Sequence, residues 1–353
     1  MAIELASDEL WMNRCFDLAR MGHGAVSPNP PVGAVLVHGG KLLSEGYHTH
    51  FGGPHAEVMA VRNVPEEKRH LIPDSTLYVS LEPCCVHGKT PPCTDLILRE
   101  RIRDVRVSAI DPNPLVAGKG LALLEQHGVH TKHGILREEG QFLIRSFSTN
   151  ILHHRPHVVL KWAQSKYGYT GMAGQQLWLS HPHTQLFSHK LRAHHDAILA
   201  GARTVETDNP YLTTREYPGR SPHRVIYDPQ GRLEMHFHVF NDDGCTVYYF
   251  SKKENKNLSG PHIKKYILSA SSDHASQMLT HLFENRIGNV IIEGGSFVHS
   301  LFIKENLWDE AWVIRTGNPM VNGIAAPIVR GELISKLVYG PDTIIGIKAK
   351  GIV

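Results

Sequence analysis

Four residues with metal-binding and proton-transfer chemistry constrain this chain more than any other feature of its sequence. His55 and Glu57 flank Ala56, Cys84 follows a Glu-Pro pair, and Cys93 comes after an interval of eight residues. One histidine and two cysteines fill three of the four tetrahedral positions of zinc and leave the fourth for water, as in catalytic zinc sites. The chain is therefore expected to fold so that these separated segments meet at one metal ion.

A zinc site with a free carboxylate beside it is suited to hydrolytic deamination. Zinc lowers the pKa of bound water from about 15.7 to about 7, and a carboxylate that is not a ligand can shuttle the proton, a contribution of about 10²–10⁴-fold. Helices are expected to start near His55 and Cys93, and the helix dipole should favour the thiolate of Cys93. The alternative is a non-catalytic zinc site or chance cysteines, which explains neither Glu57 nor Pro83.

The length of 353 residues predicts two domains, because single hydrophobic cores rarely grow beyond about 250 residues. Apolar periodicity predicts two successive series of alternating strands and helices, which is typical of layered α/β folds. We expect a three-layer first domain over 1–147, a linker over 148–156 and a second domain over 157–353. In the first domain, strands are expected at 32–37, 41–47, 76–81 and 105–110, with helices at 8–21, from 55, from 91 and onward to about 147. In the second, strands are expected at 157–163, 197–201, 223–227, 246–250, 289–292 and 310–315, with helices at 182–194, 273–283 and 296–306.

Composition argues against several other classes of protein. The chain has 37 basic and 34 acidic residues, a formal charge of +3, whereas a nucleic-acid binder typically carries a concentrated basic stripe. No window of about 18 apolar residues is present, so no membrane span is expected, and 1–9 lacks the basic start of a secretory signal. Five cysteines in so long a chain favour metal or core roles over a disulfide framework, and we expect a cytoplasmic protein.

These residues carry a family resemblance. The stretch 80–93, Ser-Leu-Glu-Pro-Cys-Cys-Val-His-Gly-Lys-Thr-Pro-Pro-Cys, resembles the deaminase half of the bifunctional riboflavin-biosynthesis deaminase/reductase family. Pro-Asn-Pro-Pro-Val-Gly at 28–33, Glu-Gly-Tyr-His at 45–48 and Gly-Pro-His-Ala-Glu at 53–57 follow the same pattern. The resemblance implies a cytidine-deaminase-like fold in which Cys85 has no role. It also implies that Zn²⁺ is bound by His55, Cys84 and Cys93, that Glu57 shuttles the proton, that Asn29 and His48 hold the pyrimidine, and that Lys89 meets the ribose phosphate.

The second half resembles the reductase of the same family. Arg-Pro-His-Val-Val-Leu-Lys at 155–161, Trp-Leu-Ser at 178–180, Asp-Asn-Pro at 208–210, Leu-Thr-Thr-Arg at 212–215 and Ile-Ile-Glu-Gly-Gly at 291–295 occur in the family's order. This half of the family is similar to dihydrofolate reductase in fold and uses NADPH to convert the ribosyl group to ribityl. The resemblance implies NADPH contacts by Ala163, Trp178, Thr204 and Asp208, contacts to the ribosylaminouracil phosphate by Gln176, Arg192, Leu212, Arg215 and Glu293, and a place for Lys161 in the active site. Guanidinium groups suit phosphate oxygens, which they bind bidentately.

The residues of the second half are less informative by themselves. No Rossmann glycine fingerprint is present. The Glu-Gly-Gly triplet at 293–295 follows an expected strand and precedes an expected helix, which is where ligands bind in α/β sheets. A strand-to-helix turn that simply needs two glycines explains the same residues.

One departure from the family leaves two interpretations of the second half open. Where the family reads Leu-Asp-Gly, this chain reads Lys-Tyr-Gly at 166–168, so Tyr167 replaces an aspartate. The chain is then either a bifunctional enzyme acting on a pyrimidine ribotide or a deaminase with a non-catalytic binding or assembly domain. An RNA-editing protein is a third possibility, but the charge of +3 and 8% aromatic content argue against a basic channel with stacking aromatics. We expect a dimer or tetramer, and no residue distinguishes NADPH from NADH.

Overall fold

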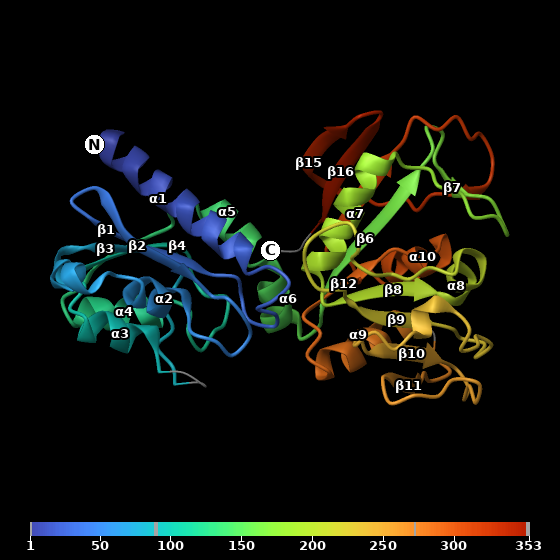
Figure 1. The fold of residues 1–353 in the computed structure, drawn as a ribbon, viewed down its shortest axis with the longest axis horizontal. Helices are drawn as coiled ribbons and strands as arrows, with labels where there is room; N and C mark the ends of the chain where they lie inside the picture. Colours follow the sequence, from blue (N-terminus) through green and yellow to red (C-terminus); the bar gives the residue numbers. More distant parts are fainter. Residues whose placement is uncertain (1, 88–90, 272, 351–353) are drawn as a thin grey trace. The chain divides into compact units, whose positions relative to one another are not determined.

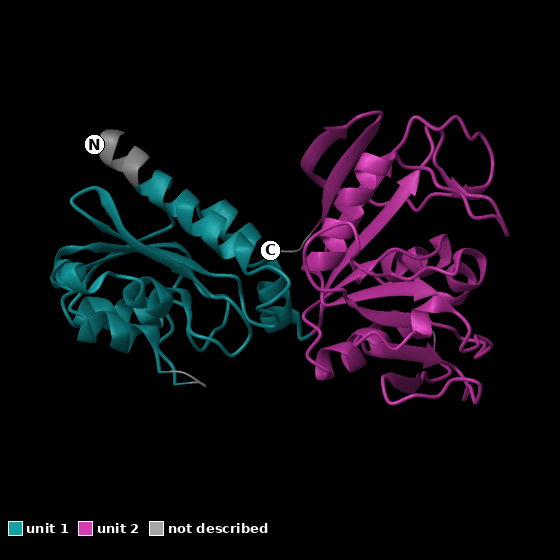
Figure 2. Cartoon of the chain, in the orientation of Figure 1, with its two compact units in different colours: residues 1–154 teal, residues 155–353 magenta. Residues whose placement is uncertain are grey.

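The computed structural model describes residues 2–87, 91–271 and 273–350, of which 2–7 by their backbone alone. The chain forms two compact units that divide between His154 and Arg155 (Figure 2). This division lies inside 148–156, the segment predicted as a linker, most of which belongs to helix α6 (Arg145–His153). No helix in the described part of the chain is long and apolar enough to cross a membrane.

The first unit is built on a five-stranded sheet in the order β2-β1-β3-β4-β5 (Figure 1). β1 pairs antiparallel with β2 and with β3, whereas β3, β4 and β5 run parallel. Gly39 and Gly40 turn the β1–β2 hairpin at positive φ, where glycine has no steric penalty. The four predicted strands are present to within one residue, but a fifth, at 130–133, lies in the stretch up to about 147 where only helices were expected. The strands are β1 (Gly33–His38), β2 (Lys41–Tyr47), β3 (Thr76–Leu81), β4 (Asp104–Ala109) and β5 (His130–His133).

Helices cover both faces of this sheet, so the predicted three-layer arrangement is confirmed (Figure 1). Successive residues of β1 point to opposite faces. Val35 belongs to the apolar core under α1 with Phe16, whereas Leu36 belongs to the core under α3 with Ile97. The first helix begins at Ala2, earlier than predicted. The helices are α1 (Ala2–Met21), α2 (Ala56–Arg62), the 3₁₀ segment η1 (Glu66–Asp74), α3 (Cys93–Arg99), α4 (Lys119–Gln126) and α5 (Arg137–Leu143).

The second unit is built on a nine-stranded sheet in the order β11-β10-β9-β8-β12-β6-β13-β16-β15. All six predicted strands are present and run parallel, as β6 (His157–Gln164), β8 (Ala197–Gly201), β9 (His223–Tyr227), β10 (Val247–Ser251), β12 (Asn289–Ile292) and β13 (Glu310–Arg315). The strands at or near the margins of this sheet, and a separate two-stranded pair, were not predicted, because polar residues interrupt the continuous apolar run that marks a central parallel strand. These are β11 (Ile263–Ile267), β15 (Gly331–Tyr339), β16 (Asp342–Ala349) and the separate pair β7 (Tyr169–Gly171) and β14 (Ile324–Ala325).

Two apolar cores lie on opposite faces of this larger sheet. Val205 of α8 (Ala202–Asp208) belongs to one core, and Leu191 of α7 (Pro182–His194) packs against it. Met278 of α9 (His274–Glu284) and Phe302 of α10 (Ser296–Lys304) belong to the other. The three predicted helices are therefore present, whereas α8 and the short η2 (His238–Phe240) were not predicted. The carboxyl ends of β6, β8 and β12 share one edge, which is where ligands bind in such sheets.

Candidate functional site

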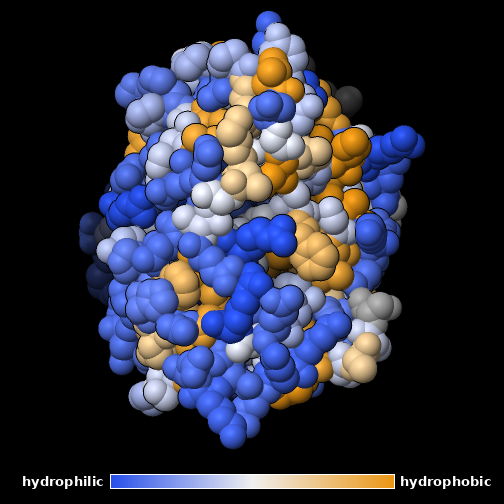
Figure 3. All heavy atoms as spheres, turned by 90° about the vertical axis from the view of Figure 1, so that its right-hand side faces the viewer, coloured by the Kyte–Doolittle hydropathy of each residue, from blue (hydrophilic) through white to orange (hydrophobic). Residues whose placement is uncertain are grey.

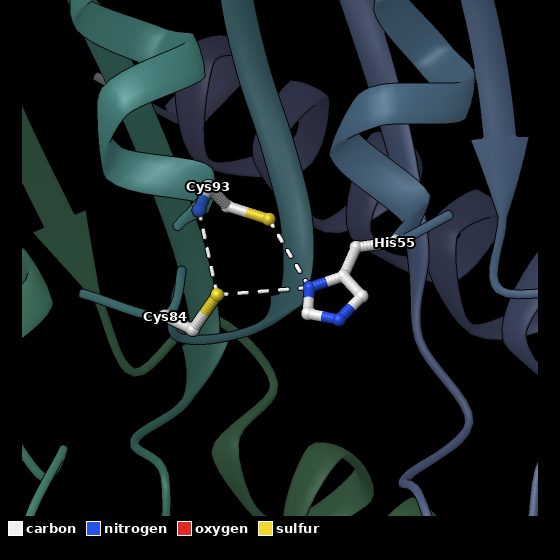
Figure 4. Close-up of side chains that lie close together, drawn as sticks. All are labelled: His55, Cys84 and Cys93. Atoms are coloured by element: carbon white, nitrogen blue, oxygen red, sulfur yellow. Dashed lines mark hydrogen bonds between the residues drawn. The ribbon is translucent and has the colours of Figure 1, made fainter. Parts of the chain in front are cut away.

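The three predicted zinc ligands lie together in the first unit (Figure 4). His55 precedes α2, Cys84 follows β3, and Cys93 is the first residue of α3. Nδ1 of His55 lies 3.3 Å from Sγ of Cys93 and 3.6 Å from Sγ of Cys84. A tetrahedral zinc with Zn–S of about 2.3 Å and Zn–N of about 2.0 Å requires nitrogen–sulfur separations of about 3.5 Å. The donor set therefore fits zinc, with Nδ1 as the histidine ligand atom.

The protonation of the two thiols differs from the expectation for Cys93. A hydrogen bond from the Cys93 thiol lowers the pKa of Cys84 to about 4, and His55 acts in the same direction. The same hydrogen bond and burial raise the pKa of Cys93. The backbone N–H of Cys93 also donates to Sγ of Cys84 over 3.4 Å. The amide at the start of α3 thus points at the sulfur of Cys84, whereas the expectation concerned Cys93. Zinc bound by both sulfurs would hold both of them as thiolates.

Glu57 lies beside the three ligands without joining them. It occupies the first turn of α2 and is buried. The metal-binding cluster found among the described residues comprises His55, Cys84 and Cys93 and does not include Glu57. Burial raises the pKa of Glu57, and the nearby His55 opposes that shift. A carboxyl group with a raised pKa next to a metal site can take up a proton and return it.

Asn29 and His48 form a hydrogen-bonded pair next to the zinc ligands. Nδ1 of His48 lies 2.9 Å from the carbonyl oxygen of Pro54, which can only accept, so this nitrogen carries the proton. Nε2 of His48 then accepts from Nδ2 of Asn29 over 3.1 Å. Burial lowers the pKa of His48, which favours this neutral tautomer. The rings of His48 and His55 meet edge to face, with centroids 5.7 Å apart. Lys89, the remaining predicted contact of this unit, lies outside the described residues.

Glu82 is a buried residue of this site that the sequence analysis missed. Its carboxylate accepts backbone N–H groups from Gly118 and Gly120 at 2.9 Å, Asp111 at 3.2 Å and Leu121 at 3.4 Å. A Cβ on Gly120 would lie 2.2 Å from the carbonyl oxygen of Pro83, so only glycine fits there. Burial raises the pKa of Asp111 in the same segment to about 6. Glu82 therefore holds 111–121 against the segment that carries Cys84. Its position two residues before Cys84, in the metal-binding motif, was the sequence feature that could have indicated this role.

Lys161, Arg192 and Glu293 form a largely buried triad of charges in the second unit, with side chains 11%, 14% and 8% exposed. Nε and Nη2 of Arg192 donate to Oε1 and Oε2 of Glu293 over 3.0 and 2.7 Å. Nζ of Lys161 lies 3.5 Å from Oε2 of the same carboxylate. Although burial opposes it, Arg192 and Lys161 hold the pKa of Glu293 at about 2. Burial lowers the pKa of Lys161, and Glu293 counteracts that shift. The structure thus brings three predicted site residues together, Lys161 on β6, Glu293 directly after β12 and Arg192 on α7.

Two further predicted phosphate contacts, Leu212 and Arg215, lie near Arg192. Its Nη1 donates to the carbonyl oxygen of Thr213 over 3.2 Å, next to the buried Leu212. The side chain of Arg215 is 47% exposed, so its guanidinium can reach a ligand. His189, a residue that the sequence analysis missed, accepts the backbone N–H of Arg215 at its Nδ1 over 3.3 Å. Burial and the charges of Arg192 and Arg215 lower the pKa of His189. No motif marked His189 as different from the other 24 histidines of the chain.

Three of the predicted cofactor contacts follow the same edge of the sheet, with Ala163 near the carboxyl end of β6 and Thr204 and Asp208 on α8, which directly follows β8. Gly295 has a φ of 70°, and a Cβ there would lie 3.1 Å from Oγ1 of Thr204, so these two residues are neighbours. Nε2 of Gln176 donates to the carbonyl oxygen of Asp208 over 3.3 Å. Ala163 lies on β6 opposite Ile314, whereas the side chain of Trp178 is 66% exposed. Figure 3 looks onto this part of the second unit, where hydrophilic residues predominate and apolar ones are interspersed.

Two family models match the chain, one in each unit. The cytidine and deoxycytidylate deaminase zinc-binding region matches residues 5–109, which contain all three predicted zinc ligands and Glu57. The RibD C-terminal domain matches residues 156–343, which contain the buried charge triad. The two matches therefore fall on the two places where the structure gathers predicted site residues.

Relatives and solved structures match over both units. The riboflavin biosynthesis protein RibD of Aquifex aeolicus is 36% identical, and the alignment covers 90% of this chain and 89% of that protein. RibD of Escherichia coli is 33% identical, with 86% of each chain covered. The crystal structure of a diaminohydroxyphosphoribosylaminopyrimidine deaminase/5-amino-6-(5-phosphoribosylamino)uracil reductase from Thermotoga maritima is 35% identical, with a TM-score of 0.90 over 98% of this chain and 99% of that one. RibD of Acinetobacter baumannii is 29% identical, with a TM-score of 0.87 over 98% and 99%.

Proposed function

Since this chain belongs to the RibD family, we propose that its units catalyse the two reactions that the name of the Thermotoga protein describes. The first unit is a zinc-dependent deaminase that acts on a diaminopyrimidinone ribotide. The second is an NADPH-dependent reductase that converts the ribosyl group of the product to ribityl, in riboflavin biosynthesis. The observation that carries this function is the triangle of His55, Cys84 and Cys93 with the buried Glu57 beside it.

The residues around the zinc ligands divide the work of deamination. Zinc, when it is bound by His55, Cys84 and Cys93, supplies a water of lowered pKa. Glu57 takes the proton of the attacking water and returns it to the departing ammonia, since its raised pKa allows it to hold that proton. Asn29 and the neutral His48 face the pyrimidine ring, and the carbonyl of Pro54 fixes the orientation of His48. Lys89 completes this set as the contact to the ribose phosphate.

The residues of the second unit position a sugar and supply a proton. NADPH supplies a hydride to the sugar carbon, which requires the ring carbon–oxygen bond to break and a proton to reach the released oxygen. Lys161 holds that proton at Nζ, and Glu293 orients it over 3.5 Å. Arg192 fixes Glu293 in turn. The phosphate is held by Arg215 together with Arg192, Gln176 and Leu212, and the cofactor by Ala163, Trp178, Thr204 and Asp208.

The bifunctional interpretation holds over a deaminase with a non-catalytic second domain. The match to the RibD C-terminal domain covers the whole parallel core of the second unit. The replacement at Tyr167, which motivated the alternative, lies in the turn between β6 and β7, and its side chain is 56% exposed. The contacts among Lys161, Arg192 and Glu293 do not involve it.

Assembly into a homo-oligomer, a dimer or tetramer, is supported by the margin of the second sheet. β15 is an edge strand, and Leu333 and Val338 on it are 65% and 71% exposed. An edge strand presents unpaired backbone groups that can pair with another chain. We expect Val338→Lys to shift the protein to a smaller species in light scattering after size-exclusion chromatography, and an unchanged mass would contradict a β15 interface.

A coupled assay tests the proposed function. Purified, zinc-loaded protein is given the diaminopyrimidinone ribotide and NADPH, and ammonia release and NADPH absorbance are followed together. We expect ammonia to appear first and NADPH to be consumed in proportion to it. Ammonia without NADPH consumption would contradict the reductase assignment, and the absence of both would contradict the whole proposal.

A further inference from the structure

His299 of α10 lies enclosed behind the contact between Lys161 and Glu293, and it is only 2% exposed. Its Nε2 is 3.2 Å from the carbonyl oxygen of Lys161 and 3.1 Å from that of Ile292. Its Nδ1 is 3.0 Å from the carbonyl oxygen of Gly295. The imidazole of His299 therefore contacts the backbone of Lys161 and the backbone on both sides of Glu293, at Ile292 and Gly295.

The contact at Nε2 lies where the ladder between β6 and β12 ends. The last residue pair of this ladder joins Ile292 to Leu160. β12 stops there, whereas β6 continues and pairs with β13. The Nε2–H group of His299 is shared between the carbonyl oxygens of Ile292 and Lys161. It therefore links strands β6 and β12 one residue beyond the last pair of their ladder. The side chains of Lys161 and Glu293 emerge at this same point, with Nζ and Oε2 3.5 Å apart.

The surroundings of the ring favour a residue that donates hydrogen bonds. The ring nitrogens of His299 face three carbonyl oxygens, which only accept. Burial lowers the pKa of His299 and so favours the neutral ring, which has a single N–H. Two of the oxygens lie at Nε2, so the proton is placed there and donated to them, whereas Nδ1 only lies near the carbonyl oxygen of Gly295. Burying a polar ring without such a bond is unfavourable, so the bond at Nε2 holds the imidazole in its place. Trp162 packs edge to face against it, with ring centroids 5.6 Å apart. An apolar side chain of similar size would fill the space but would not connect the two strand ends.

We propose that His299 is a positioning residue of the reductase, which sets the separation of Lys161 and Glu293 through the backbone of β6 at Lys161 and of β12 at its end. This inference rests on the proposed reductase function of the second unit. His299 lies behind the reacting groups, so its replacement should change how the proton donor is placed and not how the phosphate is held. The expected signature is a loss in kcat for NADPH oxidation with little change in KM for the deaminated substrate.

Three substitutions separate the two ring nitrogens. His299→Leu removes both. His299→Gln keeps an amide N–H near the position of Nε2, and His299→Asn keeps one near the position of Nδ1. We expect a fall in kcat of about 10- to 100-fold for the leucine variant, since a displacement of about 1 Å at a reacting group can cost about 10²-fold. Glutamine should recover most of that loss, whereas asparagine should not, because only glutamine reaches the carbonyls of Lys161 and Ile292.

A matched control comes from His274, another buried histidine of the same unit. It lies on α9 and its Nδ1 contacts the hydroxyl of Tyr227 over 2.7 Å. His274→Leu should lower the unfolding temperature as His299→Leu does, while leaving kcat within about twofold of wild type, because a stability loss alone does not move reacting groups. Ammonia release by the first unit serves as an internal standard in every variant.

The outcomes separate this inference from the function on which it rests. Failure of the wild-type protein to oxidise NADPH with the deaminated substrate would overturn the proposed function itself. An active wild type with a normal kcat in His299→Leu would overturn the positioning role alone. Equal losses for the leucine, asparagine and glutamine variants, or a loss in kcat for His274→Leu of the same size, would reduce His299 to a structural residue. Rescue by glutamine alone would support the proposal.

Discussion

The two units build their sites from different chemistry. In the first, one imidazole nitrogen and two sulfurs lie within 4.8 Å of one another and leave a nearby carboxylate free. In the second, two cations surround one carboxylate, and the three side chains are 8–14% exposed. Histidine and cysteine at metal-ligand spacing are rare in sequences, whereas lysine, arginine and glutamate are common. A metal site can therefore be recognised from residue types, but a buried charge triad acquires meaning only from the fold that assembles it.

The comparison also concerns stability. The apolar cores of the first unit lie on the two faces of its sheet and do not include His55, Cys84 or Cys93. Replacing a zinc ligand therefore leaves no uncompensated charge inside these cores. Removing one member of the triad leaves other buried charges without a partner. Substitutions in the first site should therefore affect chemistry alone, whereas those in the second should affect chemistry and folding together.

The largest expected effect is on deamination when a zinc ligand is removed. Cys84→Ser should abolish zinc binding and reduce ammonia release to background, because it removes one of three ligand atoms. NADPH oxidation with the deaminated substrate should stay within about twofold of wild type. Cys84 lies in the first unit, and substitutions at distant sites that share no partners usually act independently. Cys85→Ser is the matched control, because Cys85 lies next to the ligand and outside the cluster. Equal zinc loss in both variants would show that the ligand assignment is wrong.

Glu57→Gln should affect the same reaction less, and without loss of metal. Removing the proton shuttle should slow ammonia release by about 10²–10⁴-fold. Zinc content and the unfolding temperature should be unchanged, because Glu57 is not a ligand and glutamine has the same shape. The measurement pairs ammonia release with metal analysis of the same sample. A parallel fall in zinc content would make Glu57 a structural residue of the site.

Glu293→Gln should lower the stability of the second unit as well as its activity. The substitution leaves Arg192 and Lys161 buried without their counter-charge, which typically costs about 3–5 kcal/mol. We expect a loss of NADPH oxidation and a lower unfolding temperature of the second unit in calorimetry. Ammonia release by the first unit should persist. An unchanged transition would remove the proposed difference between the two sites.

The same carboxylate predicts how stability depends on pH. Its pKa is about 2 in the folded protein and ordinarily 4.5, so the folded state favours the ionised form. Glu293 therefore contributes stability that is fully present above pH 4.5 and is lost as pH falls toward 2. A difference of this size corresponds to on the order of 3 kcal/mol. Denaturant unfolding of wild type and Glu293→Gln at several pH values in this window should show a steeper decline for wild type.

The central elements of both units could be predicted from the sequence, because they carry strong local patterns. The strands of the parallel cores are continuous apolar runs, and His55, Cys84 and Cys93 lie in a motif of rare residues. The hydrogen bond from the amide at the start of α3 to the sulfur of Cys84 could not be predicted, since it depends on how the loop between Cys84 and Cys93 folds.

Other residues were missed because long-range packing alone gives them a role. His189 and His299 are two of 25 histidines, and only the fold brings one to Arg215 and the other to the end of β12. The hairpin β15–β16 was missed for a different reason. It lies at the margin of the sheet, where Val338 and other exposed residues interrupt the apolar pattern that marks a central strand.

The smallest expected effect belongs to Tyr167, the departure from the family that first placed the second unit in doubt. Its side chain is 56% exposed in the turn that joins β6 to β7, and Nζ of the neighbouring Lys166 lies 5.9 Å from the centre of its ring. Tyr167→Asp should therefore change stability by no more than about 0.5 kcal/mol, as exposed substitutions generally do. For the same reason kcat for NADPH oxidation should change by less than about threefold. A larger gain would mean that this turn reaches the substrate during reduction, and that the site of the second unit extends beyond its buried charges.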